Sequence, residues 1–128
     1  MSNSGGDKTI PSSTTSTITS QITLTRGIWV VACDVRWDSS GEGKGIRYIG
    51  INGYDTPQSN CFAYHTQSFL NFNNVVGGIS NAMTTQSFCT ILRITATTDT
   101  KYLHVLQNSG SSLNTVYNNI FAYKLLGL

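Results

Sequence analysis

The sequence has little charge and little that could hold a metal ion or a disulfide framework. Only 11% of its 128 residues are charged, and it contains two histidines and three cysteines. Three cysteines cannot all pair within one chain, so free thiols are expected. Cys33 and Cys89 lie within apolar strand patterns, where cysteine usually behaves as a small buried hydrophobe. No close pair of Cys or His residues suggests a metal site, and the sequence predicts no metal and no cofactor.

Several partner classes are also excluded. The formal net charge is only +2, and the basic residues are scattered singly rather than clustered with aromatic residues, so we expect no nucleic acid partner. No apolar run approaches the ~20 residues of a membrane-spanning helix. The N-terminus lacks the basic start and apolar core of a signal peptide. We therefore expect no membrane insertion and no signal-dependent export.

What the sequence does contain is a period-2 alternation of apolar and polar residues, which predicts β-strands. In the run from Ile28 to Trp37, every second residue from Trp29 to Trp37 is predicted to face inward. A second run, Gly45 to Ile51, follows a glycine-rich polar turn, so the two runs are predicted to form an antiparallel hairpin. Similar alternation occurs in residues 16–25, 88–96, 102–107 and 115–126, with a turn expected at 98–100.

These strands predict one all-β domain. No window shows a sustained helical period, so essentially no helix is expected. Seven to ten short antiparallel strands with regular turn signals are typical of a sandwich or jelly roll. Residues 1–17 are rich in Ser, Thr and Gly and are predicted to be a flexible tail or linker, with the domain spanning 18–128. Two further short strands are expected at 60–67 and 68–76.

Four segments carry a family resemblance. Residues 24–37 read L-T-x-G-I-W-x-V-x-x-x-V-x-W, and residues 45–53 read G-I-R-x-I-x-I-N-G. The V-x-Q-N-S-G of residues 105–110 and the final IFAYKLL complete the pattern. Together they resemble the complement-globular-head family of tumour-necrosis-factor-like jelly rolls, versions of which lie at the tips of bacteriophage tail fibres. The resemblance implies an antiparallel jelly-roll β-sandwich of about ten strands that assembles as a homotrimer and uses its outer loops for recognition.

The resemblance also implies a function. A collagen-like stalk and a secretion signal are missing, which favours the viral or prophage branch, and the calcium ligands of some relatives have no clear counterpart. The chain is then the receptor-binding head at the tip of a phage tail fibre, made in the host cytoplasm and carried on the virion. Its partner would be a bacterial cell-surface receptor, with a glycan as the candidate class. Two alternatives stay open: a structural domain that trimerises and caps a fibre without a ligand, and a carbohydrate-acting enzyme.

Candidate recognition residues come from the irregular middle of the chain, because loops on a rigid scaffold carry binding and aromatic groups supply much contact energy. Ordinary loop packing is the competing interpretation. The candidate ligand-binding residues are Tyr54, Asp55, Phe62, Tyr64 and His65.

The candidate trimer-interface residues lie in the strands. Aromatic residues between subunits add apolar contact while their hydroxyl groups stay hydrogen-bonded. His104 is either packed in the domain or at the interface. The two histidines are the only candidate bases near neutral pH and neither lies in a catalytic motif, so no catalytic residue is predicted. The candidate interface residues are Tyr102, His104, Tyr117 and Tyr123.

Overall fold

The protein is all-β in the computed structural model, which describes residues 2–38, 45–69 and 84–128. Its strands are β1 (Ser2–Gly5), β2 (Lys8–Ile10), β3 (Thr17–Trp37), β4 (Gly45–Asn52), β5 (Ala63–Phe69), β6 (Thr84–Gln107) and β7 (Leu113–Leu126). They are hydrogen-bonded in the order β1-β7-β3-β6-β4-β5, with β2 also paired to β7, and every pair is antiparallel. The described residues include no helix, and so none that could cross a membrane. The count of about ten strands stays a prediction, as does the strand at 68–76, most of which lies outside the described residues.

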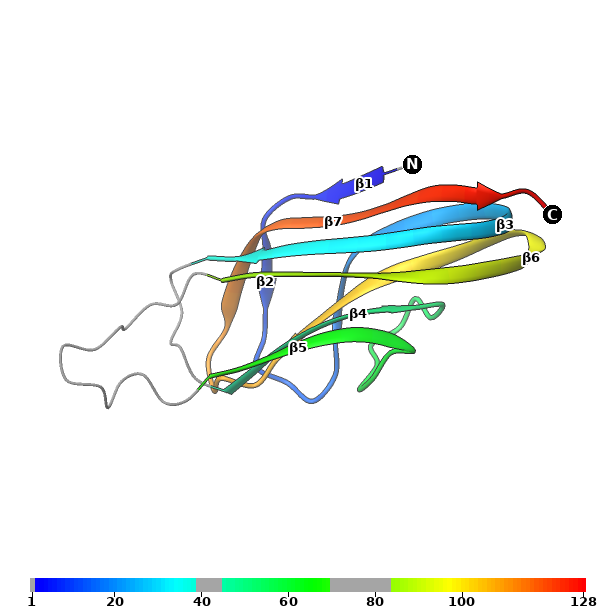
Figure 1. The fold of residues 1–128 in the computed structure, drawn as a ribbon. Coiled ribbons are helices and arrows are strands. Elements are labelled where there is room, and N and C mark those ends of the chain that lie inside the picture. The colour runs from blue at the N-terminus through cyan, green and yellow to red at the C-terminus, as the bar shows by residue number, and fades with distance from the viewer. Residues whose placement is uncertain (1, 39–44, 70–83) are drawn as a thin grey trace.

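Two long strands build both layers of the fold. β3 has 21 residues and β6 has 24, and they pair along most of their lengths. Figure 1 shows both turning back at its right-hand end, so each strand contributes to two layers. The first layer combines β1 and β7 with residues 28–37 of β3 and 84–93 of β6. The second combines β4 and β5 with residues 17–25 of β3 and 98–107 of β6.

Gly27 lies at the point where β3 turns. The pairing with β6 slips between Thr25 and Gly27, and the Gly27 φ angle is 150°. A Cβ atom there would lie 2.6 Å from the Leu126 carbonyl oxygen. Only glycine accommodates both the backbone conformation and this close approach of β7.

The core lies between the layers and confirms the predicted inward face of β3. Trp29 is 7% exposed, and Val31, Cys33, Val35 and Trp37 are fully buried. They share one cluster with second-layer residues Ile49, Ile51, Leu103 and Val105. Burying a large apolar side chain contributes roughly 1.5–3 kcal/mol, so this cluster is the main stabilising element of the sandwich.

The predicted hairpin between the two opening runs is wrong. β3 is bonded to β6 on one edge and to β7 on the other, so no edge of residues 28–37 is free for β4. β4 lies in the second layer between β5 and β6. The predicted turn at 98–100 also differs, because the two halves of β6 pair with β3 in separate layers rather than with each other. In both cases the alternation located the strands but not their partners.

The N-terminal segment differs from the flexible tail or linker expected for residues 1–17. β1 and β2 pair with β7, in the registers Ser2↔Phe121 and Lys8↔Thr115. Ile10 is 1% exposed and anchors the segment in the core. Backbone hydrogen bonds to a free strand edge do not depend on apolar side chains, and so a Ser- and Thr-rich segment can form strands there.

The three cysteines are unpaired, as expected for free thiols. Cys33 and Cys61 are buried, and burial raises the pKa of both thiols. The expectation that Cys89 is buried is wrong, since it is exposed on β6. Its strand alternates as predicted, but the face that carries Cys89 is uncovered in the single chain.

Candidate functional site

An open hollow of about 540 Å³ lies where the loop after β4 meets the start of β5. Two aromatic residues line it and are well exposed, Tyr54 at 61% and Phe62 at 54%. Exposed aromatic rings in a concave site supply much contact area at small entropic cost. The full lining is Asn52, Gly53, Tyr54, Asn60, Cys61, Phe62 and Lys101.

Asn52 holds the two ends of the loop together. Its side-chain oxygen accepts a hydrogen bond from the Gly53 N–H at 2.7 Å, and its side-chain nitrogen donates to the Asn60 carbonyl at 3.3 Å. The Cys61 N–H donates to the Tyr48 hydroxyl at 2.7 Å. These bonds attach both sides of the loop to β4 and set the width of the hollow.

Lys101 supplies the charged group of the hollow. Its Nζ lies 5.8 Å from the centre of the Phe62 ring and donates a 2.9 Å hydrogen bond to Asp99 Oδ2. The lysine side chain is only 15% exposed, against 38% for the aspartate. The Asp99 carboxylate therefore balances most of the positive charge that Lys101 brings.

A buried serine–histidine pair fastens the middle of the same loop. His104 Nε2 lies 2.9 Å from the Tyr54 carbonyl oxygen, and His104 Nδ1 lies 2.7 Å from Ser16 Oγ. Ser16 Oγ accepts the Gln58 N–H at 2.9 Å, so the serine hydroxyl proton is free to point at Nδ1. The imidazole is then neutral with its proton on Nε2, donating to Tyr54. Burial lowers the pKa of His104, which favours this neutral form.

Ser16 and His104 are hydrogen-bonded as a catalytic nucleophile and its base would be, but a substrate cannot reach them. Ser16 is 4% exposed and His104 is fully buried. A substrate carbonyl has no path to the serine oxygen, which already accepts a backbone hydrogen bond. The role of the pair in this structure is to hold the loop that carries Tyr54 in place.

The structure separates the five candidate ligand-binding residues. Tyr54 and Phe62 line the hollow, and Asp55 is exposed on the same loop. Tyr64 is 58% exposed and stacks on Tyr48 at 5.3 Å between ring centroids, outside the lining of the hollow. His65 points to the other side of β5, where its Nδ1 accepts a 3.0 Å hydrogen bond from Gln86 Nε2. The period-2 alternation of β5 explains why Tyr64 and His65 point to opposite sides, whereas Phe62 precedes the strand.

Sequence reasoning missed Lys101, Asn52 and Asn60. β4 pairs with β6 in the register Asn52↔Tyr102, which brings Lys101 to the end of β4. The sequence could not place Lys101 near β4, because the predicted hairpin pairs β4 with residues 28–37 of β3. A correct β4–β6 pairing would have been the signal.

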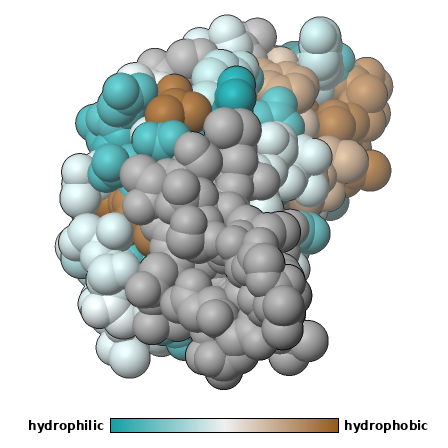
Figure 2. Space-filling model, turned by 90° about the vertical axis from the view of Figure 1, so that its left-hand side faces the viewer, coloured by the Kyte–Doolittle hydropathy of each residue, from teal (hydrophilic) through white to brown (hydrophobic). Residues whose placement is uncertain are grey.

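A second surface lies on the outside of the first layer. Val30 of β3 is opposite Ile91 of β6 on one side and Tyr123 of β7 on the other, and these last two are 66% and 68% exposed. Figure 2 shows hydrophobic side chains gathered at its upper right. We call this surface the apolar face, and its apolar residues are Ile28, Val30, Ala32, Cys89, Ile91, Tyr117, Phe121, Tyr123 and Leu125. The same side of the sheet also carries Arg93 opposite Ile28, and Asp34 and Asn119 between Phe121 and Tyr117.

The candidate interface residues divide between this face and the second layer. Tyr117, 40% exposed, and Tyr123 lie on the apolar face. Tyr102 is half-buried on the second half of β6. His104 is buried inside the chain. Of the two positions expected for it, packed in the domain or at the trimer interface, the structure has the first. The trimer itself stays a prediction.

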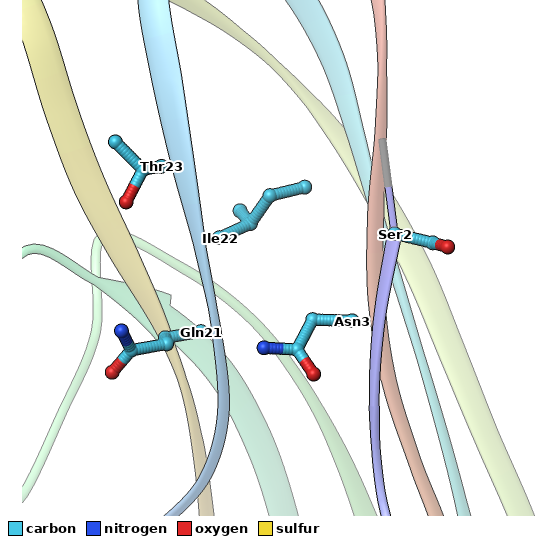
Figure 3. Close-up of a pocket in the computed structure, with 5 residues that line it drawn as sticks. All are labelled: Ser2, Asn3, Gln21, Ile22 and Thr23. Carbon is cyan, nitrogen blue, oxygen red and sulfur yellow. The ribbon is translucent and has the colours of Figure 1, made fainter.

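A smaller hollow of about 220 Å³ lies between β1 and β3. Figure 3 shows Asn3 and Ile22 pointing into the space between the two strands, whereas Gln21 and Thr23 lie on the far side of β3. The lining carries no ionisable side chain. In the described ranges, no group of three or more His, Cys, Asp or Glu residues could hold a metal ion.

No protein-family model matches the sequence, and no curated protein matches it significantly. Among solved structures, Eiger TNF from S. frugiperda superposes with a TM-score of 0.60 over 100% of this chain and 94% of that one, at 11% identity. The C-terminal CBM6 of the marine laminarinase LamC from Zobellia galactanivorans covers 91% and 89% at 16% identity, with a TM-score of only 0.31. At 11% identity the likeness to Eiger TNF is one of fold alone. The protein is an antiparallel all-β chain with a tumour-necrosis-factor-like jelly-roll fold.

Proposed function

We propose that the chain is the non-enzymatic, trimeric receptor-binding head of a phage or prophage tail fibre, which recognises a receptor on the bacterial surface. The observation that carries the proposal is the apolar face. Ile91 and Tyr123 are about two-thirds exposed, and neither belongs to the cluster of core residues between the layers. Val30 and Ala32 lie beside Ile91, Tyr123 and Phe121 in the pairing of β6, β3 and β7. An exposed apolar patch of this kind is characteristic of an interaction site, and further copies of the chain would cover it.

Two further observations support the proposal. The sequence segments at 24–37, 45–53 and 105–110 resemble the complement-globular-head family, and the fold is similar to that of a tumour necrosis factor. The hollow beside Tyr54 and Phe62 lies on the second layer, away from the apolar face, so it would stay open in an assembly that covers that face. Threefold presentation multiplies weak single-site binding without any new contact.

A structural fibre cap is the second candidate function. It requires the apolar face but makes no use of the hollow. The two functions therefore differ in one observable, which is whether the assembled chain adsorbs to cells.

The test is adsorption of the fluorescently tagged chain to a panel of bacterial strains, measured by flow cytometry. The head function predicts saturable binding to a subset of strains. It also predicts at least tenfold weaker binding when Tyr123→Glu places a charge in the apolar face and divides the assembly. A trimeric chain that adsorbs to none of the strains would favour the structural cap.

A further inference from the structure

We propose that the hollow lined by Tyr54, Phe62 and Lys101 is the recognition site of the domain and that it takes an uncharged saccharide. This inference rests on the proposed function and names the ligand class of that site. Its volume of about 540 Å³ lies within the ~300–1,000 Å³ range of small-molecule sites.

The two aromatic rings suit the apolar side of a sugar ring. A pyranose presents C–H groups on its ring faces and hydroxyl groups around its rim, and aromatic side chains contact the former. Tyr54 and Phe62 are each more than half exposed and line the same hollow. Lys101 Nζ lies 5.8 Å from the centre of the Phe62 ring, so a sugar that packs against the ring beside the lysine would have its rim within reach of a hydrogen-bond donor.

The charge balance favours a neutral ligand. Lys101 is the only ionisable amine in the lining, and Asp99 accepts one of its hydrogen bonds at 2.9 Å. A ligand carboxylate would have to compete with Asp99 and would also meet the exposed Asp55 on the same loop. Sugar hydroxyl groups accept hydrogen bonds from the remaining ammonium protons and from the Asn60 amide without displacing the aspartate.

The hollow is already formed without a ligand. Asn52 ties the loop ends, and His104 and Ser16 fasten the loop at Tyr54 and Gln58. A site whose walls are fixed in advance loses little conformational entropy on binding. The loop bonds are therefore part of the recognition site although they do not contact the ligand.

The test measures binding of the assembled 128-residue chain to an array of neutral and carboxylate-bearing saccharides. We expect neutral saccharides to bind, Phe62→Ala to weaken that binding about tenfold, and added salt to leave it unchanged. The matched control is Tyr64→Ala, an exposed aromatic two residues away that does not line the hollow, and it should change binding less than about threefold. Solution mass and circular dichroism of both variants confirm that they assemble and fold.

Three results would overturn the inference: binding restricted to carboxylate-bearing saccharides, no binding to any neutral saccharide, or an effect of Tyr64→Ala equal to that of Phe62→Ala.

Failure of the saccharide site is distinguishable from failure of the proposed head function. If Phe62→Ala adsorbs to bacteria as strongly as the unmodified chain, the receptor site lies elsewhere while the head function stands. If the chain binds neutral saccharides but adsorbs to no strain, the hollow is a saccharide site and the head function fails.

Discussion

Lowering the pH should loosen the loop that carries Tyr54, because His104 holds that loop as a neutral imidazole. Burial lowers the pKa of His104 below its ordinary value of 6.5. In the unfolded chain the same imidazole takes up a proton near pH 6.5. Between pH 6.5 and the lower native pKa, the unfolded state therefore binds more protons, and stability falls as the pH falls. Above pH 6.5 both states are neutral and His104 adds no pH dependence.

The size of the effect follows from one proton. Titration of His104 changes the free energy of unfolding by at most about 1.4 kcal/mol per pH unit within that window. Protonation at Nδ1 also removes the acceptor that the Ser16 hydroxyl uses at 2.7 Å. Urea unfolding followed by tryptophan fluorescence, from about pH 7.5 to about pH 5 at one fixed protein concentration, measures the slope.

The matched variants are His104→Gln, which keeps an N–H donor for Tyr54 without titrating, and His65→Gln. The difference between the unmodified chain and His104→Gln should grow smaller as the pH falls through the window. An unchanged slope in His104→Gln, together with a flattened slope in His65→Gln, would refute the reasoning.

Three other perturbations test separate parts of the structure. Gly27→Ala should destabilise the fold by about 1–3 kcal/mol, because the new Cβ meets the Leu126 carbonyl at a strained φ angle. Thermal melting measures the loss, and an unchanged midpoint would contradict the account of the turn in β3. Trp37→Phe should cost about 1–3 kcal/mol in urea unfolding, since it leaves a buried amide oxygen without its 2.7 Å donor; a neutral result would mean that the bond contributes little. Cys89 should be protected from a maleimide in the assembled chain and should react in Tyr123→Glu, as measured by mass spectrometry. Equal labelling of the unmodified chain and Tyr123→Glu would count against coverage of the apolar face.

The sequence predicted the strands and their faces well because alternation is a local property. The inward face from Trp29 to Trp37 and the inward Ile94 and Leu92 of β6 all follow from the period of two. The partners of the strands could not be predicted in the same way. A strand with one apolar face can pair with several neighbours, and the fold-back at Gly27, which places two halves of β3 in different layers, depends on the distant β7.

The candidate site was predictable only in part for the same reason. Tyr54 and Phe62 stood out as aromatic residues in an irregular segment, and both line the hollow. Lys101 comes from a strand about forty residues further along the chain, and only the β4–β6 register brings it there. His104 could be recognised as a strand residue, but its hydrogen bond to the Tyr54 carbonyl depends on how the loop folds over the sheet.

The measurement that tests the central claim most directly is the solution mass of the chain by light scattering coupled to size exclusion. The account predicts about three times the 13.9 kDa chain mass. It also predicts a lower mass for Tyr123→Glu and an unchanged mass for Tyr64→Glu, which places the same charge at a comparably exposed tyrosine of the second layer. A single-chain mass for the unmodified protein, or loss of assembly in Tyr64→Glu but not in Tyr123→Glu, would contradict it.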